Sequence, residues 1–501
     1  MGTIVETRSG KVRGEREGDL HVFRGIPYAR PPVGERRFRP PEPEEPWAGV
    51  RDATRFGPSA PQRGMRIDFL PGMDVGLQDE DCLYLNVTTP GADGARRPVL
   101  VWIHGGAFTI GSGSQPMYDV RRLARRGRAV LVTINYRLGA LGFLHLREHL
   151  GEAYAGSGCL GILDQVAALG WVHENIAAFG GDPGNVTIFG ESAGGMSVGT
   201  LLGTPAARGL FQRAIPQSGA AHSTASAEEA SQVLERMLAL LRSEAGALRA
   251  IPVERLLEAQ DRLAAETLGR GGILPFRPVV DGGALPEPPI EAIRRGFAAG
   301  VAVLVGSTRD EWNLFALLDA GLAGLDEARA LARLERCLGE RARGVVEAYR
   351  AARAARGAAT DARSLFLAIE SDRVFRIPAV RLAEAQCRHE PRTFQYLFTW
   401  ESPMLGDMLG ACHGVDVPFV FGAVDTPGAD KFIGSGPAVR ELADRTMDAW
   451  LAFARDGEPA AALPRWQPYD AEGRATMLLG PACSVEDDPL GAERRAWEGI
   501  L

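Results

Sequence analysis

Residues 185–195 read Asn-Val-Thr-Ile-Phe-Gly-Glu-Ser-Ala-Gly-Gly, and this stretch decides the fold. Its first part is rich in the β-branched and aromatic residues of a buried strand, and its end has the small residues that can open a helix. Between them lies the pattern G-x-S-x-G, which on a strand-to-helix turn raises the hydroxyl of Ser192 above a sheet. A bare G-x-S-x-G also fits a plain glycine-rich turn, so the assignment depends on the surrounding chain.

Strand-like runs and helical patterns alternate on both sides of this stretch. Residues 98–103 and 129–134 are apolar at successive positions, as strands buried on both faces must be, and residues 302–305 and 392–400 predict two more strands. Within 161–179 the apolar residues recur at helical spacing and predict a helix that packs on the sheet. These residues are Ile162, Val166, Leu169, Val172 and Ile176. The alternation predicts an α/β fold with a large, mostly parallel central sheet flanked by helices.

The length of 501 residues corresponds to about three domains of average size, although single α/β domains are often larger. We find no internal repeat and no linker that separates two compositions, so we expect one α/β domain over residues 1–501. Residues 322–385 are rich in Ala, Arg, Glu and Leu, with few strand formers. They predict a helical cap over the edge of the sheet.

Composition and charge exclude several classes of function. The formal net charge of −7 gives no general attraction for a polyanion, so nucleic acid is not expected as a partner. Among the cationic residues only Lys11 and Lys431 are lysines, a skew toward arginine that we attribute to codon composition. No stretch approaches 18 uninterrupted apolar residues, and the first residues lack the pattern of a secretory signal. We therefore expect no membrane association, a cytoplasmic location, and a monomer, with a weak dimer as the alternative.

The six cysteines are scattered singly, without the Cys-x-x-Cys pairs of a zinc ribbon or a redox motif. This spacing predicts free structural thiols, and it fits a reducing compartment. The cysteines are Cys82, Cys159, Cys337, Cys387, Cys412 and Cys483. We expect no metal site.

A second glycine-rich segment, His-Gly-Gly-Ala-Phe at 104–108, follows directly after the predicted strand at 98–103. It resembles the oxyanion-hole loop of lipases and esterases. Acyl transfer turns an ester carbonyl oxygen into an alkoxide, and main-chain N–H groups at Gly106, Ala107 and Ala193 are the candidate donors to it. The alternative, a phosphate cradle, normally carries G-K-[ST] or G-x-G-x-x-G, and neither follows here.

Over nearly its whole length the sequence resembles the type-B carboxylesterase and cholinesterase family of α/β-hydrolases. The matching segments are Phe23-Arg24-Gly25-Ile26-Pro27-Tyr28-Ala29, Pro31-Pro32-Val33-Gly34, Glu80-Asp81-Cys82-Leu83-Tyr84-Leu85-Asn86-Val87, Phe179-Gly180-Gly181-Asp182-Pro183, the turn through Gly195, and Gln217-Ser218-Gly219. The resemblance implies the α/β-hydrolase fold and a catalytic triad.

The resemblance places the acid of the triad in the segment 306–311, at Glu311, with Asp310 as the rival, and the base at His413. The order Ser192, Glu311, His413 agrees with the order of nucleophile, acid and histidine in this fold. The role of general base suits an imidazole, whose unperturbed pKa is about 6.5, and we expect activity to fall as the pH drops through the pKa of His413. The other histidines lie in helical, loop or polar surroundings, and His104 is expected to shape the oxyanion loop.

Several neighbours have supporting roles in this interpretation. Gly105 and Glu191 are expected beside the triad, with Glu191 as a buried structural partner, and Ser218 as a nearby hydrogen-bond donor. Cys412 is expected to pack beside the base, and Asp416 is a further candidate neighbour.

Two features depart from the family pattern. Trp312 stands where a glycine commonly follows the acid, so the backbone around Glu311 is open to question. Secreted relatives pair the cysteine equivalent to Cys82 with one upstream, and no cysteine precedes residue 82 here. Aromatic and apolar residues are candidates for an apolar acyl or alcohol site, although such residues are more often simply core. They are Phe108, Leu274, Phe276, Trp312 and Phe315.

The resemblance implies a serine carboxylesterase that acts on small-molecule esters through an acyl-enzyme and uses no metal or organic cofactor. Carbamate or amide hydrolysis, or lactone opening, on the same residues stays open, because leaving-group preference depends on pocket shape. A non-catalytic, cholinesterase-like binding protein is the third alternative. The intact Ser192, Glu311 and His413 argue against it.

Overall fold

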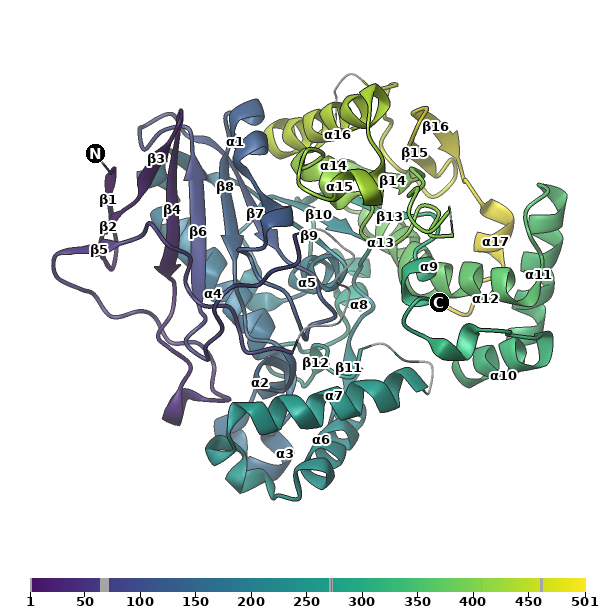
Figure 1. Cartoon of the computed structure of the whole chain (residues 1–501), viewed down its shortest axis with the longest axis horizontal. Coiled ribbons are helices and arrows are strands. Elements are labelled where there is room, and N and C mark those ends of the chain that lie inside the picture. Colours follow the sequence, from purple (N-terminus) through teal and green to yellow (C-terminus); the bar gives the residue numbers. More distant parts are fainter. Residues whose placement is uncertain (1, 64–71, 270–271, 273, 407, 460–462) are drawn as a thin grey trace.

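A computed structural model describes residues 2–63, 72–269, 272, 274–406, 408–459 and 463–501, and its centre is an 11-stranded sheet (Figure 1). The strand order is β16-β15-β14-β13-β10-β9-β7-β8-β6-β4-β3. The strands are β3 (Glu15–Glu17), β4 (Leu20–Pro27), β6 (Tyr84–Thr89), β7 (Arg97–Ile103), β8 (Val130–Ile134), β9 (Gly181–Glu191), β10 (Arg213–Gln217), β13 (Ala302–Thr308), β14 (Thr393–Phe398), β15 (Ala475–Leu479) and β16 (Ser484–Asp487). Neighbours from β8 to β15 pair in parallel, and antiparallel strands close both ends. The predicted mostly parallel sheet is confirmed.

Two small sheets lie outside this one. β1 (Ile4–Thr7), β2 (Gly10–Arg13) and β5 (Val50–Asp52) form a three-stranded sheet near the N-terminus, and β11 (Ala225–Ser226) pairs with β12 (Val279–Val280).

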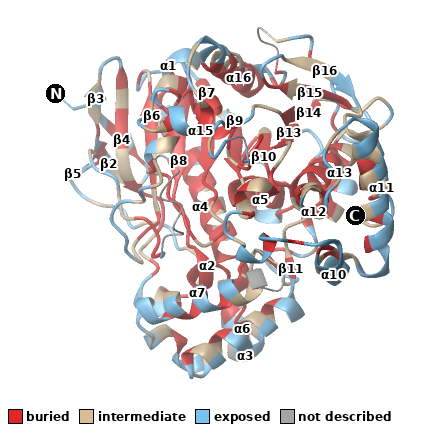
Figure 2. Cartoon of the chain, turned by 45° about the vertical axis from the view of Figure 1, so that its right-hand side comes forward, coloured by how far each residue is buried: buried red, intermediate tan, exposed pale blue. Residues whose placement is uncertain are grey.

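The central strands are buried on both faces. Along β7, Val99, Val101 and Ile103 belong to one hydrophobic core, while Leu100 and Trp102 belong to the other. All five side chains are fully buried, and Figure 2 shows the buried interior running the length of the sheet. Successive apolar residues were therefore the correct signal for this strand, because side chains of a strand alternate between faces.

Helices cover each face. α4 (Leu160–Asn175), α5 (Ala193–Leu201) and α13 (Ile377–Gln386) pack on one face, and α8 (Pro289–Arg294) packs on α5 and α13. α1 (Arg121–Gly127), α14 (Val417–Phe421) and α16 (Pro437–Asp456) cover the other face. Among the described residues one helical stretch, Glu152–Phe179, is long and apolar enough to cross a membrane, and 72% of its most apolar window is buried inside the molecule. Its apolar composition reflects the core position of α4.

Two further groups of helices lie outside the sheet layers. α2 (Gly139–Phe143), α3 (Arg147–Leu150), α6 (Ala227–Leu241) and α7 (Val253–Gly269) gather at the bottom of Figure 1. α10 (Glu327–Leu338), α11 (Ala342–Ala355) and α12 (Ala362–Ser371) project on the right. A π-helical turn, Asp372–Arg376, joins α12 to α13. The region 322–385 is thus helical as expected, but its last helix, α13, lies directly on β13 and β14 as part of the sheet's cover.

Candidate active site

Ser192 lies at the turn between β9 and α5. Its backbone has φ 60° and ψ −127°, a strained combination for a residue with a side chain. The main chain holds it there, because the Ser192 N–H donates to the Gln217 carbonyl at 3.0 Å. A Cβ on Gly194 would lie 2.0 Å from the Ile103 carbonyl oxygen, so only glycine allows α5 to start this close to β7. The turn therefore has the geometry of a nucleophile elbow.

The 104–108 loop lies against this elbow. A Cβ on Gly105 would sit 3.0 Å from the Ser192 Cβ, so the absence of a side chain lets the two segments touch. Gly106 and Ala107 both adopt positive φ, 109° and 54°. Within the described residues the N–H groups of Gly106, Ala107 and Ala193 have no protein acceptor, which leaves three donors free beside the serine.

His104 supports that loop. Its Nδ1 lies 2.8 Å from the Gly105 carbonyl oxygen, and its ring stacks on Tyr136 with centroids 4.4 Å apart. The Tyr136 hydroxyl donates to the His104 carbonyl at 2.8 Å. Burial lowers the pKa of His104 to about 4, so the ring is neutral near neutral pH. These contacts fit a shaping role.

The structure brings Glu311, and not Asp310, onto the histidine. The Glu311 Oε2 lies 2.5 Å from the Nδ1 of His413, and its Oε1 accepts the Thr308 N–H at 2.7 Å. Glu311 is completely buried. The Asp310 carboxylate instead accepts the Ala411 N–H at 2.9 Å and pairs with Arg309. Glu311 is thus the carboxylate placed to fix the tautomer of His413.

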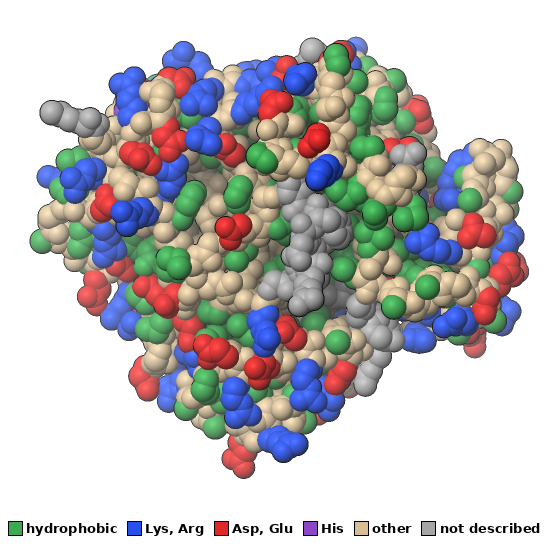
Figure 3. All heavy atoms as spheres, viewed as in Figure 1, with side chains coloured by type: hydrophobic (Ala, Val, Ile, Leu, Met, Phe, Trp, Pro, Cys, Tyr) green, Lys and Arg blue, Asp and Glu red, His purple; other side chains and the backbone are tan. Residues whose placement is uncertain are grey.

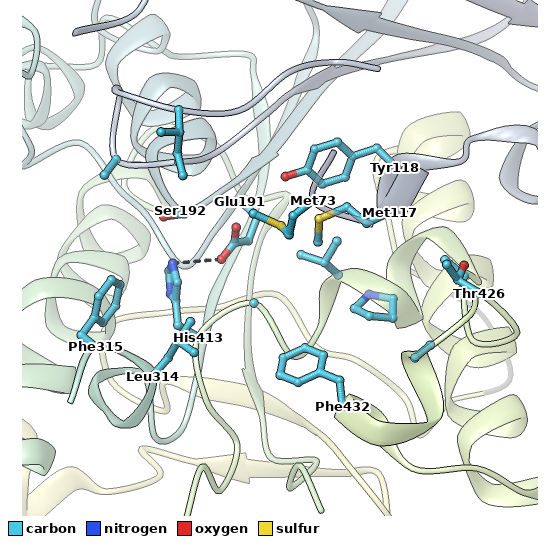
Figure 4. Close-up of a pocket in the computed structure, with 18 of the residues that line it drawn as sticks. Met73, Met117, Tyr118, Glu191, Ser192, Leu314, Phe315, His413, Thr426 and Phe432 are labelled. Carbon is cyan, nitrogen blue, oxygen red and sulfur yellow. Dashed lines mark ion pairs between the residues drawn. The ribbon is translucent and has the colours of Figure 1, made fainter. Parts of the chain in front are cut away.

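A second carboxylate approaches the other nitrogen. Glu191 Oε1 lies 3.2 Å from the His413 Nε2 (Figure 4). Among the described residues no hydrogen bond joins Ser192 Oγ to His413, although both line one cavity. Catalytic hydrogen bonds in unliganded sites are often long and tighten only with substrate.

The two carboxylates change the titration of the base. Burial alone would lower the pKa of His413, but the negative charges of Glu191 and Glu311 outweigh it and raise that pKa to about 9. The pKa of His413 therefore lies above the ordinary value of an imidazole, which is about 6.5. Burial also raises the pKa of Glu191 to about 8. The position of Glu191 agrees with the buried partner expected from the sequence.

The remaining predicted neighbours of the triad differ in their hydrogen bonds and burial. The expected hydrogen bond from Ser218 is absent, because within the described residues its buried hydroxyl has no partner. Asp416 accepts a hydrogen bond from the Gln217 amide at 2.9 Å, and burial raises its pKa to about 6. Cys412 is buried in the core, and all six cysteines are free thiols. In the described parts of the chain no group of three or more His, Cys, Asp or Glu side chains has the geometry to hold a metal ion.

Trp312 is accommodated where the family commonly has glycine. Its main-chain N–H donates to the Ser371 hydroxyl at 2.9 Å. Trp312 and Phe315 are the first and last residues of α9 (Trp312–Phe315), and the centroids of their rings lie 5.1 Å apart. Glu311 retains ordinary helical angles, φ −46° and ψ −49°. The bulky residue does not disturb the acid.

A cavity of about 120 Å³ opens beside the serine and the histidine. Its described walls are Met73, Gly106, Ala107, Ile110, Met117, Tyr118, Glu191, Ser192, Leu314, Phe315, Leu318, His413, Gly414, Val417, Pro418, Ala423, Thr426, Ala429 and Phe432. Figure 4 shows Ser192, Glu191 and His413 near one end, with Thr426 and Phe432 across the cavity. Apart from Glu191 and His413, its described walls carry no charged side chain, whereas the outer surface mixes both signs (Figure 3).

Of the apolar candidates named from the sequence, only Phe315 is among the described lining residues. Phe108, Phe276 and Trp312 are buried in the core, and Leu274 packs against it. The opposite wall comes from α14 and α15 (Ala429–Ile433), short helices that were not predicted from the sequence as part of the cavity. Phe375, whose ring lies 4.7 Å from that of His413, was also missed, since no motif marks it.

Comparison with known proteins agrees with this geometry. The model of the carboxylesterase family matches residues 1–497. The para-nitrobenzyl esterase of Bacillus subtilis (strain 168) is 41% identical over 500 residues, 98% of each chain, and the phenmedipham hydrolase of Pseudarthrobacter oxydans is 36% identical over 490 residues, 95% of each chain. The crystal structure of the Geobacillus stearothermophilus carboxylesterase EST55 at pH 6.2 has a TM-score of 0.89 at 46% identity, covering 99% of this chain and 100% of that one.

Proposed function

The chain belongs to the carboxylesterase family and is a carboxylic ester hydrolase, and we propose that it works through an acyl-enzyme formed on Ser192. In acylation the Ser192 hydroxyl attacks the ester carbonyl while its proton passes to the His413 Nε2. The N–H groups of Gly106, Ala107 and Ala193 donate to the oxyanion. Collapse of the tetrahedral intermediate expels the alcohol, which takes the proton back from His413.

Deacylation repeats the same steps with water. His413 removes a proton from the water, the hydroxide adds to the acyl carbonyl, and the Ser192 oxygen leaves with that proton. Glu311 holds the Nδ1–H and stabilises the imidazolium that forms in each half of the cycle. Acid, alcohol and free enzyme result.

One observation carries this proposal: His413 is hydrogen-bonded through Nδ1 to a fully buried carboxylate, and it lines the same cavity as Ser192. Replacing Ser192 with alanine should lower kcat for a 4-nitrophenyl ester by about 10⁶-fold, the loss found when a serine hydrolase loses its nucleophile. A fluorophosphonate should label the wild-type chain once and leave Ser192→Ala unlabelled. Substantial hydrolysis by Ser192→Ala would show that another group performs the chemistry.

For the substrate, the cavity walls favour neutral esters with apolar groups. Leu314, Phe315, Val417 and Phe432 supply apolar surface, and the hydroxyls of Tyr118 and Thr426 are its only neutral polar side chains beyond Ser192 among the described walls. A carboxylate on the substrate would be desolvated there, and the cationic side chain among the described walls, His413, is already paired with Glu191 and Glu311. Carbamates, amides and lactones stay as alternatives on the same triad. A panel of acyl and alcohol chain lengths, with one carbamate, one amide and one lactone, ranked by kcat/KM, separates them.

For the location, we keep the cytoplasm as a proposal. It is supported by six free cysteines, of which Cys82, Cys159 and Cys412 are buried as thiols. Activity and antibody signal in fractionated cells would test it.

A further inference from the structure

The long helix formed by α12, the π-helical turn and α13 contacts the base of the triad and the residue next to its acid. The Phe375 ring, fully buried, lies 4.7 Å from the His413 ring, and the Phe315 ring lies 5.0 Å from it. The Ser371 hydroxyl accepts the N–H of Trp312, the residue that follows Glu311. One helix therefore contacts the His413 ring and the residue that directly follows Glu311.

The π-helical turn has a sequence cause. Pro378 has no N–H to donate to the carbonyl four residues earlier, so a regular α-helix cannot run through this point. The chain widens over Asp372–Arg376, and the wider turn changes the direction in which the next side chains point. Phe375 belongs to this turn, and the centroid of its ring lies 4.7 Å from that of His413.

A buried polar cluster fixes the turn. Asp372 and Arg376 form a two-point ion pair across it, with Nε–Oδ1 2.6 Å and Nη2–Oδ2 2.5 Å. The Tyr349 hydroxyl of α11 donates to Asp372 as well, and the Trp497 Nε1–H donates to that hydroxyl at 2.7 Å. All four residues are buried. Such a network is rigid when every member is satisfied.

We propose that Phe375 is a positioning residue for His413, and that the C-terminal segment holds it in place through Trp497, Tyr349 and the Asp372–Arg376 pair. The inference rests on the proposed function, because it takes His413 as the general base. Phe375 and Phe315 pack against the imidazole and keep its Nδ1 on Glu311 and its Nε2 beside Glu191, at the cavity that Ser192 also lines. A base that moves by about 1 Å loses up to about 10²-fold in rate, even when the cause lies outside the chemistry.

The first experiment compares Phe375→Ala with Phe366→Ala. Phe366 is a buried phenylalanine of the same helix whose ring faces the Arg333 guanidinium instead of His413. Phe375→Ala should lower kcat for 4-nitrophenyl butyrate on the order of tenfold to a hundredfold with KM unchanged. The downfield proton resonance of the His413 Nδ1–H should broaden with it. Phe366→Ala should lose stability but keep both kcat and that resonance.

A kcat and a resonance in Phe375→Ala equal to those of Phe366→Ala would overturn the proposal. Phe375→Leu keeps apolar volume and decides the question if the alanine variant does not fold; it should show the same kind of loss, and wild-type values in it would also contradict the proposal. Wild-type hydrolysis and fluorophosphonate labelling come first. Their failure would count against the proposed function and not against the role of Phe375.

The second experiment tests the connection to the C-terminus. Tyr349→Phe keeps the ring but removes the hydroxyl that joins Trp497 to Asp372, so it should reduce kcat by less than Phe375→Ala and leave KM unchanged. Combined with Phe375→Ala it should add no further loss, since both act on one contact. Two results would show that the C-terminal segment does not act on His413. One is a double variant in which the two losses of kcat multiply, and the other is a wild-type kcat in Tyr349→Phe.

Discussion

Ser192 and its oxyanion loop are held in place by main chain, whereas His413 and Glu311 are held mostly by side chains. In the first region Ser192 bonds to the Gln217 carbonyl, and Gly194 lies against the Ile103 carbonyl. In the second, a carboxylate and aromatic rings surround the imidazole. The first region therefore tolerates little change of backbone, and the second depends on which side chains are delivered to it from distant helices.

The difference explains what can vary in such a site. The elbow needs small residues at fixed spacing, which gives it a recognisable motif. The contacts on His413 need shape and polarity at positions that are far apart in the sequence, such as Phe315 and Phe375.

The largest expected loss of activity distinguishes Glu311 from its neighbour Asp310. Glu311→Gln should lower kcat/KM by about 10⁴-fold, because the amide keeps the size but no longer stabilises the imidazolium or its tautomer. Asp310→Asn keeps an acceptor for the Ala411 N–H and should retain most of the activity. Steady-state kinetics on one ester measure both. Equal losses of kcat/KM in Glu311→Gln and Asp310→Asn would show that Glu311 is not the acid that acts on His413.

A smaller loss should follow from disturbing the main-chain region. A Cβ on Gly106 would lie 2.2 Å from the Ile110 carbonyl oxygen, at φ 109°, so Gly106→Ala must displace the loop. The expected fall in kcat is about 10²–10³-fold, the loss of one oxyanion donor. Gly170→Ala is the matched control, since it lies in α4 with open space around it. A normal kcat in Gly106→Ala would mean that this amide does not face the oxyanion.

A shift of the pH profile should follow from Glu191→Gln. His413 accepts a proton only when neutral, so activity is present above its pKa and is lost as the pH falls through it. Removing the Glu191 charge takes away one cause of the raised pKa, so the acid limb of kcat/KM should move to lower pH. Profiles of wild type, this variant and the exposed control Glu174→Gln measure the shift. If the acid limb of kcat/KM does not move in Glu191→Gln, the charge of Glu191 does not affect the pKa of His413.

The smallest effect belongs to Ser218. Its hydroxyl is buried without a partner in the described structure, so Ser218→Ala removes an unsatisfied polar group. The thermal midpoint should stay level or rise, and kcat should stay at the wild-type value. A marked fall in kcat would reveal a hydrogen bond that forms only during turnover.

The sequence predicted the elements that carry their own pattern. β7 and β8 are continuous apolar runs, α4 has a clear helical spacing, and the elbow has its motif. β10 was missed even though it lies between β9 and β13, because it is short and contains Pro216, a residue that argues against a central strand.

The candidate site was predicted to a similar degree. Ser192, Glu311 and His413 followed from the motif and the family resemblance, and the structure brings Glu311 onto His413. The raised pKa of His413 depends on the three-dimensional approach of Glu191, which neighbouring positions in the sequence do not reveal. The apolar wall of α14 and α15 lies on helices of five residues each, too short to show a period.

The distribution of lysines has a practical consequence for handling the enzyme. Both are exposed, Lys11 on β2 and Lys431 on α15, the helix whose Ala429 and Phe432 line the catalytic cavity. Aldehyde or succinimidyl supports couple to side-chain amines, so through lysine side chains they could attach to this protein only at Lys11 and Lys431. Attachment at Lys431 would tether α15, the helix that forms part of the cavity wall. Attachment through an introduced surface thiol or a tag would leave that wall untethered.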